Sequence, residues 1–294
     1  MKTNPSLRAR FTVGRVSGEL MRRGLSMLCL MEKRKRSLSG QVALVTGASR
    51  GIGKAIALLL GARGVSLVLV GRSERALGEA VGEVVYGGGQ ARHVVGDVRD
   101  PATLSHAVER AVSAFGGLDI AIANAGISGV TALGEAGSSE RARAIIDTNL
   151  LGTMHTFDAA FRVMREGGRL IAVSSVLAKF GVPGYAAYCA SKAGILGLVR
   201  AVAHEGGARQ ITCNAICPGW ADTLMAAEGI RSIAQATGVS VAAAKADATQ
   251  RFPLGRFLEP EEVANFVAYV ASPEASGITG QALSICGGST AFGS

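Results

Sequence analysis

The chain has 294 residues, 48% of them hydrophobic and 18% charged, which suits one large domain with a buried core and excludes a disordered chain. No stretch approaches the roughly 18 consecutive apolar residues that a membrane-spanning helix needs. The net charge of +9 suggests a nucleic-acid partner, but residues 1–38 hold ten of the 31 basic and only two of the 22 acidic residues. The remainder is almost neutral, so we expect it to bind neither nucleic acid nor a membrane.

Residues 1–38 form a basic N-terminal extension without a clear helical or strand period. Its many arginines and few acidic residues also suit a mitochondrial targeting peptide, and its charge would suit an arm that binds polyanions. A secretory signal is disfavoured, because the apolar segment Leu25–Met31 is short and the basic run Lys33–Arg36 follows it. We favour a disordered extension, translated upstream of a working start at Met27 or Met31.

From Gln41 onward, short apolar runs alternate with amphipathic helical patterns, which is typical of successive β-α units. The predicted strands are Val42–Thr46, Ser66–Val70, Arg92–Val95, Ile120–Ala123, Arg169–Ser174, Ile211–Cys217 and Ala282–Ile285. Predicted helices include Lys54–Ala62, Ala102–Phe115, Ser139–Leu151 and Ser191–Glu205. This order predicts an α/β, doubly wound Rossmann fold: one domain over residues 39–294, with a seven-stranded, mainly parallel sheet and helices on both faces. Ligands should bind at the carboxyl ends of the strands.

The first predicted strand ends in a glycine-rich turn that leads directly into a helix. The turn comprises Thr46, Gly47, Ala48, Ser49, Arg50, Gly51, Ile52 and Gly53. Glycines allow the backbone to turn sharply and to approach a pyrophosphate, whose charge then faces the N–H groups of the helix N-terminus. The spacing differs from the general dinucleotide fingerprint, but its position between a strand and a helix predicts a dinucleotide site.

The end of the second strand indicates which dinucleotide binds. Enzymes that prefer NAD usually place an acidic residue there to bond the ribose 2′-hydroxyl, whereas this chain has Gly71 followed by Arg72. Arg50 lies within the glycine turn. Because a 2′-phosphate needs cationic partners, we predict NADP(H), although both arginines could simply be solvated surface residues.

Five cysteines stand in the chain without the spacing of a metal site, and we predict no metal. They are Cys29, Cys189, Cys213, Cys217 and Cys286. An odd number without a partner pattern indicates reduced, buried thiols in an intracellular protein.

A possible acid-base pair follows the fifth strand. Tyr188 and Lys192 are four residues apart and share one helix face. A tyrosine that exchanges protons near neutral pH needs a pKa far below its usual value of about 10, and burial alone raises it. Lys192 would supply one of the positive charges required, and an oxidised nicotinamide ring another. A nearby serine, Ser174 or Ser175, could polarise a carbonyl oxygen.

With these residues in place, the chain resembles the short-chain dehydrogenase/reductase family over residues 41–288. The resemblance selects Ser175 over Ser174, thirteen residues before the tyrosine, and implies that Asn149 anchors a proton relay with Tyr188 and Lys192. It also implies that the cofactor contacts Asp97, Val98, Asn124, Ala125, Gly126, Pro218, Gly219 and Thr223, with Thr223 on the carboxamide. Ala123 departs from the family, which usually has Asn there. The resemblance implies hydride transfer between NADP(H) and a carbonyl or alcohol carbon of a small molecule.

The segment after Pro218, about residues 222–257, carries two helical patterns and should form a lid over the substrate. Tyr185, Trp220, Leu224 and Met225 are the candidate substrate contacts. The C-terminal part resembles 3-oxoacyl-carrier-protein reductases, especially ketoreductases of aromatic polyketide synthesis. A 3-oxoacyl or polyketide ketone, which could be thioester-linked, is therefore the expected substrate. An alcohol, steroid or sugar dehydrogenase is the nearest alternative.

A non-catalytic NADP(H)-sensing or scaffold protein on the same fold is the alternative from another class. A pure binder would not need Asn149, Ser175, Tyr188 and Lys192 together. The resemblance further implies a cytoplasmic homotetramer, assembled through the helices that bear Asn149 and Tyr188.

Overall fold

The computed structural model describes residues 38–250 and 252–291. Almost all of the basic extension predicted for residues 1–38 lies outside these residues, and so do the alternatives of a targeting peptide and a polyanion-binding arm. The following description concerns the domain that begins at Leu38.

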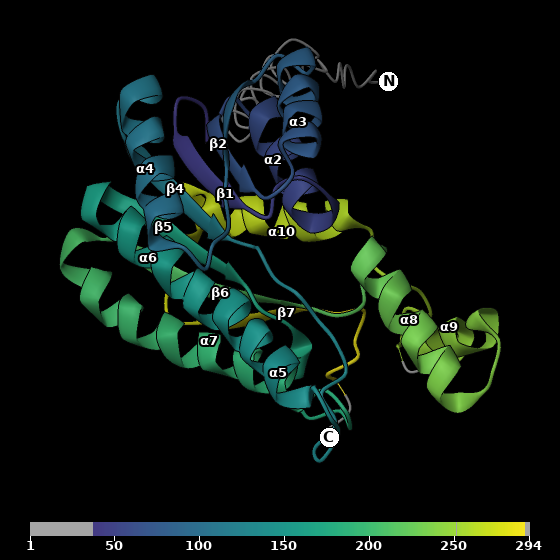
Figure 1. The fold of residues 1–294 in the computed structure, drawn as a ribbon. Coiled ribbons are helices and arrows are strands. Elements are labelled where there is room, and N and C mark those ends of the chain that lie inside the picture. The colour runs from purple at the N-terminus through teal and green to yellow at the C-terminus, as the bar shows by residue number, and fades with distance from the viewer. Residues whose placement is uncertain (1–37, 251, 292–294) are drawn as a thin grey trace, which may run out of the picture. The chain divides into compact units, whose positions relative to one another are not determined.

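Seven strands form one sheet in the order β3-β2-β1-β4-β5-β6-β7, and every neighbouring pair is parallel (Figure 1). The strands are β1 (Val42–Thr46), β2 (Ser66–Gly71), β3 (Gln90–Val95), β4 (Leu118–Ala123), β5 (Met164–Val173), β6 (Thr212–Pro218) and β7 (Ala282–Ile285). The predicted doubly wound fold is confirmed. The chain order reverses between β1 and β4, and the carboxyl ends beside this switch point are where such folds bind ligands.

Helices cover both faces of the sheet, because successive side chains of a strand point to opposite faces. Val45, Leu69 and Ile122 face α2 (Gly51–Ala62), α3 (Glu74–Tyr86) and α10 (Pro260–Ala271) in one core. Leu44, Val68 and Ala121 face the opposite core, with α4 (Pro101–Phe115), α6 (Gly152–Val163) and α7 (Ala186–Gly206). Among the described residues, α7 alone is long and apolar enough to cross a membrane, but its apolar side chains pack in this core.

Two helices differ from their predicted bounds in ways that affect the site. The helix predicted for Ser139–Leu151 is α5 (Ser138–Ile146), which runs through a π-helical turn at Asp147–Leu151 into α6. Periodicity does not reveal such a turn, which inserts one residue into an otherwise regular helix. Helix α7 begins at Ala186 and not at Ser191, so Tyr188 lies in its first turn.

The predicted lid contains α8 (Leu224–Thr237) and α9 (Val241–Gln250), which lie side by side beyond the carboxyl end of β6 (Figure 1). The segments that enter and leave the lid, which we call its two stems, are joined by backbone hydrogen bonds. Leu258 N–H donates to Trp220 O at 2.9 Å, and Asp222 N–H donates to Leu258 O at 2.8 Å. The lid has a small apolar core of its own, formed by Ala226, Ile230, Ala234, Ala244 and Phe257.

Candidate active site

The glycine turn is folded tightly against the end of β4. Gly47 and Gly51 have φ values of +65° and +55°, which side chains disfavour. A Cβ on Gly53 would lie 2.3 Å from Gly47 O and 2.4 Å from Asn124 Nδ2. The shape of the turn therefore requires the three glycines. Because they carry no side chains, the backbone of the turn stays accessible at the N-terminus of α2.

Thr46 and Asn124 hold this turn in place. The Asn124 amide donates to Thr46 O at 3.0 Å and to Gly47 O at 3.2 Å. Thr46 Oγ1 accepts from the backbone N–H groups of Asn124 and Ala125 at 3.1 and 3.2 Å. Both side chains thus brace the turn within the protein, and their predicted contact with the cofactor stays a prediction.

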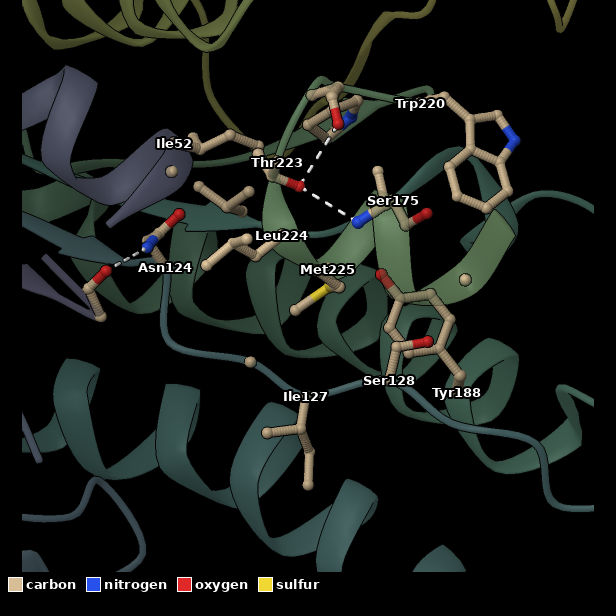
Figure 2. Close-up of a pocket in the computed structure, with 18 of the residues that line it drawn as sticks. Ile52, Asn124, Ile127, Ser128, Ser175, Tyr188, Trp220, Thr223, Leu224 and Met225 are labelled. Atoms are coloured by element: carbon tan, nitrogen blue, oxygen red, sulfur yellow. Dashed lines mark hydrogen bonds between the residues drawn. The ribbon is translucent and has the colours of Figure 1, made fainter. Parts of the chain in front are cut away.

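A cavity of about 990 Å³ extends from the glycine turn to the lid. Twenty-one of the predicted site residues line it: Gly47, Ser49, Arg50, Gly51, Ile52, Arg72, Asp97, Val98, Asn124, Ala125, Gly126, Ser175, Tyr185, Tyr188, Lys192, Pro218, Gly219, Trp220, Thr223, Leu224 and Met225. Thr46, Gly53 and Asn149 do not line it. Figure 2 shows Asn124, Ser175, Tyr188 and Met225 around this common space.

One end of the cavity is basic. Arg50 and Arg72 are exposed there, and within the described part of the chain neither forms an ion pair. Asp97 is nearby, but its carboxylate is bound by Arg99 at 2.8 Å, and this hydrogen bond lowers the pKa of Asp97. The two guanidinium groups therefore remain available to an anionic ligand, while the acidic group is engaged.

The structure separates the two candidate serines. Ser174 Oγ donates to Lys192 O at 2.9 Å, which ties the end of β5 to α7. Ser175 Oγ accepts from Leu177 N–H at 3.1 Å, and its nearness to the Tyr188 hydroxyl opposes the rise of the Tyr188 pKa that burial causes. Ser175 therefore lies beside the tyrosine, and its role in catalysis stays a prediction.

Lys192 is almost fully buried beside Tyr188. Its Nζ donates to Val173 O at 2.9 Å and lies 5.7 Å from the centre of the Tyr188 ring. Burial lowers the pKa of Lys192 to about 8 and raises that of Tyr188 to about 12. Lys192 alone therefore does not provide the low tyrosine pKa that the sequence argument required, because the loss of hydration outweighs its charge.

Asn149 lies in the π-helical turn, behind the cavity wall. Its amide contacts both backbone groups of Ile127, with Oδ1 accepting at 2.8 Å and Nδ2 donating at 2.9 Å. Nδ2 also donates to Ser191 Oγ at 3.1 Å, and Ser191 in turn donates to Tyr188 O at 2.8 Å. Ser191 was absent from the predicted site. Its position between Tyr188 and Lys192 in the same helix was the only available signal in the sequence.

The lid end of the cavity is mainly apolar. Besides the four predicted substrate contacts, six residues that were not predicted line it: Phe180, Val182, Gly229, Ala244, Ala248 and Phe252. Ile233, within the predicted lid, lines it as well. Thr223 caps α8, accepting from Ala226 N–H at 3.2 Å. Its methyl group faces Gly51, where a Cβ would lie 3.2 Å away, so the start of the lid contacts the glycine turn.

The cysteines follow the prediction only in part. Cys213 and Cys217 are free and buried, whereas Cys189 and Cys286 are free but only half-buried. The prediction of burial was wrong for these two, because Cys189 lies on a less covered side of α7 and Cys286 lies in a turn after the last strand. Cys29 lies outside the described residues.

The residues present fit a dinucleotide that carries an additional phosphate. The glycine turn leaves no room for side chains, the N-terminus of α2 is open, and two arginines flank the space after β2. At the other end, a half-buried tyrosine and a serine hydroxyl share the cavity with a buried lysine. Such a set can bind a carbonyl oxygen and supply a proton to it.

Comparisons with known proteins agree with this geometry. Residues 47–290 match the family model described as Enoyl-(Acyl carrier protein) reductase. The putative ketoacyl reductase of the monensin polyketide synthase from Streptomyces virginiae is 39% identical, over 85% of this chain and 97% of that protein. The 3-oxoacyl-[acyl-carrier-protein] reductase of Escherichia coli is 36% identical, over 86% and 98%. A variant of actinorhodin polyketide ketoreductase, solved with NADPH, matches with a TM-score of 0.80 and 36% identity, over 86% and 98%.

Proposed function

Because this chain belongs to the short-chain dehydrogenase/reductase family, we propose that it is an NADPH-dependent ketoreductase whose substrate is a 3-oxoacyl or polyketide ketone. One observation carries the proposal. Ser175 and Tyr188 line the same cavity that runs to the glycine turn and to Arg50 and Arg72. The site therefore joins a carbonyl-binding centre to a dinucleotide cradle.

In the proposed reaction, the hydroxyls of Ser175 and Tyr188 both bind the carbonyl oxygen and draw electron density onto it. NADPH, when bound, supplies the hydride that reduces the carbonyl carbon. Tyr188 gives its proton to the oxygen as negative charge develops there. Because burial raises the pKa of Tyr188 to about 12, the hydroxyl carries its proton at neutral pH, which suits reduction of the carbonyl.

Lys192 and Asn149 support this proton transfer. The Lys192 ammonium stands beside the Tyr188 ring, where its charge favours loss of the tyrosine proton and where it would hold the nicotinamide ribose. Asn149 is fixed by Ile127 and Ser191, and we propose that it anchors the relay that returns a proton from solvent. Ser174 and Ser191 act as positioning residues, since their hydroxyls bond the backbone of the tyrosine helix.

The preference for NADPH over NADH follows from the charges near the end of β2. Gly71 offers no acidic side chain to a ribose 2′-hydroxyl, while Arg72 and Arg50 offer positive charge to a 2′-phosphate. A guanidinium can bind phosphate with two parallel hydrogen bonds, which adds geometric selectivity.

The direct test measures oxidation of NADPH and NADH by purified protein with a panel of substrates. The panel includes a 3-oxoacyl thioester, a bicyclic ketone, a steroid ketone, a keto-sugar and an enoyl thioester. We expect turnover with NADPH on the 3-oxoacyl thioester or the bicyclic ketone. Tyr188→Phe should abolish it while NADPH still binds. Unchanged turnover in this variant would contradict the mechanism.

The alternatives make different predictions in the same assay. Reduction restricted to the steroid or sugar ketone would indicate an alcohol, steroid or sugar dehydrogenase. Binding of NADPH without turnover of any substrate would favour the sensing or scaffold protein.

We also propose a cytoplasmic homotetramer. The free thiols suit a reducing compartment, and Leu151 and Met154 leave apolar surface exposed near Asn149. Sedimentation equilibrium would measure the assembly.

A further inference from the structure

One half-buried histidine contacts the wall of the cavity from behind and has no part in the proposed reaction. His155 lies on α6, and its Nδ1 is 3.1 Å from Val98 O. A carbonyl oxygen only accepts hydrogen bonds, so Nδ1 carries the proton and donates it. Val98 is itself almost fully buried and lines the cavity. The hydrogen bond therefore joins α6 to the cavity wall.

Gly152 provides a second contact between α6 and Val98. A Cβ on Gly152 would lie 2.6 Å from Val98 Cγ2, so the backbone of the helix packs directly against that side chain. Gly152 and His155 are three residues apart and share one face of α6. The helix thus packs against the side chain of Val98 and binds its carbonyl oxygen.

Helix α6 is a rigid support for these two contacts. It is buried along one side, through Gly152, Thr153, Thr156, Phe157 and Ala160, and it packs beside α4 on the sheet (Figure 1). The Thr156 hydroxyl donates to Gly152 O at 2.7 Å, which reinforces the first turn. A group that is bound to this helix is therefore held in a fixed place relative to the sheet.

Val98 belongs to a short loop that follows β3 and is partly exposed. Gly96 N–H donates to Gly71 O at 2.9 Å, which fastens the start of the loop to the end of β2. Asp97 and Arg99 bond each other within the loop, with Arg99 N–H donating to Asp97 Oδ1 at 2.9 Å. The bond from His155 joins the middle of this loop to a helix 57 residues further along the chain.

The strand order indicates which half of the cofactor meets this loop. The ends of β2 and β3 lie on one side of the glycine turn, and Tyr188 lies on the other, after β5. A dinucleotide with its pyrophosphate at the turn and its nicotinamide beside Tyr188 must extend its adenosine half toward β3. Resting on the proposed function, we propose that His155 is a positioning residue for the cofactor, which fixes Val98 as part of the surface that binds the adenosine half.

Adenosine 2′,5′-bisphosphate tests this role without turnover, because it has the adenosine half and the 2′-phosphate but no nicotinamide. Isothermal titration calorimetry measures its affinity and that of NADPH. His155→Ala should weaken both ligands about threefold to tenfold, the range expected for the loss of one net hydrogen bond. The KM for NADPH should rise by a similar factor, while kcat at saturating NADPH stays within about twofold.

Two conservative variants separate the hydrogen bond from the bulk of the side chain. In His155→Asn, the amide nitrogen is one bond from Cγ, as Nδ1 is, so this variant should restore affinity to within about twofold of the wild type. In His155→Gln, the nitrogen lies one bond further out, where Nε2 stands, and affinity should stay low. His106→Ala, at an exposed histidine of α4, is the matched control and should change neither affinity. Thermal unfolding of each variant shows that it is folded at the assay temperature.

The outcomes separate this inference from the proposed function. Wild-type affinity for the bisphosphate in His155→Ala, or equal weakening in His155→Ala and His155→Asn, would overturn the role of His155 and leave the proposed function intact. So would weaker binding of NADPH without weaker binding of the bisphosphate, since the adenosine half would then be unaffected. The expected losses of affinity, together with no reduction of any ketone by the wild type, would support His155 and refute the proposed reduction. Failure of the wild type to bind either nucleotide would overturn both.

Discussion

Replacing Gly53 by alanine tests whether the glycine turn has the tight geometry described above. The new Cβ would lie 2.3 Å from Gly47 O and 2.4 Å from the Asn124 amide, inside contact distance of both. To relieve this overlap, the turn would have to give up the two hydrogen bonds of Asn124, each worth about 1 kcal/mol. Overpacking adds about 1–3 kcal/mol, and the better helix propensity of alanine offsets about 1 kcal/mol.

The net destabilisation is therefore about 2–4 kcal/mol, which corresponds to a fall in Tm of roughly 5–15 °C for a domain of this size. NADPH affinity should fall at least about tenfold, because the displaced backbone is the surface expected to meet the pyrophosphate. Thermal unfolding and fluorescence titration with NADPH measure the two effects.

Gly78→Ala is the matched control, since its helical position has no atom within 4 Å of the new methyl group. It should leave affinity unchanged and raise stability by about 0.4–1 kcal/mol. Wild-type Tm and affinity in Gly53→Ala would refute the description of the turn.

Three further predictions concern the charged and polar groups of the site. Arg72→Ala should lower kcat/KM for NADPH about tenfold or more and leave that for NADH within about threefold, and equal losses with both cofactors would contradict the 2′-phosphate assignment. Lys192→Met should be inactive but more stable than the wild type at pH 7, because burial lowers the Lys192 pKa from 10.5 to about 8. The folded state binds its proton less tightly than the unfolded state, so the cost of the buried charge is full below pH 8 and disappears between pH 8 and 10.5. Denaturant unfolding of both proteins across this range should show the difference shrinking, and a constant difference would argue against a charged Lys192. Ser191→Ala should lower kcat more than KM and alter the pH profile of kcat, with Ser191→Thr restoring part of the loss, whereas a uniform loss of folded protein would indicate a structural role alone.

The sequence predicted the fold because the strands are short, apolar and separated by helical patterns of consistent length. It also predicted the pairing of Tyr188 with Lys192, since neighbours four residues apart on a helix need no tertiary information. The glycine turn and its two arginines also followed from the residues alone, whereas the resemblance to a known family supplied Asn149, which lies behind the cavity wall, and the cofactor contacts beyond β2.

Contacts between distant parts of the chain could not be predicted. Asn149 and Ser191 are 42 residues apart, and only packing of the π-helical turn against α7 brings them together. The bracing roles of Thr46 and Asn124 depend on how β1 and β4 end side by side. The pKa of Tyr188 depends on its burial, which a residue pattern does not measure. The lid depends on the packing of α8 against α9, and the apolar residues of α9 show only weak helical periodicity.

The separate apolar core of the lid has a consequence for how this enzyme can change over evolution. Within the described residues, the five buried side chains between α8 and α9 belong to neither core of the sheet. A substitution among them therefore loosens the lid locally and leaves unaltered most of the free energy that holds the sheet and its glycine turn together. Substitutions in the lid can thus change the substrate range, and so can exchange of the whole segment between the joined stems. In both cases the sheet and its glycine turn are inherited unchanged.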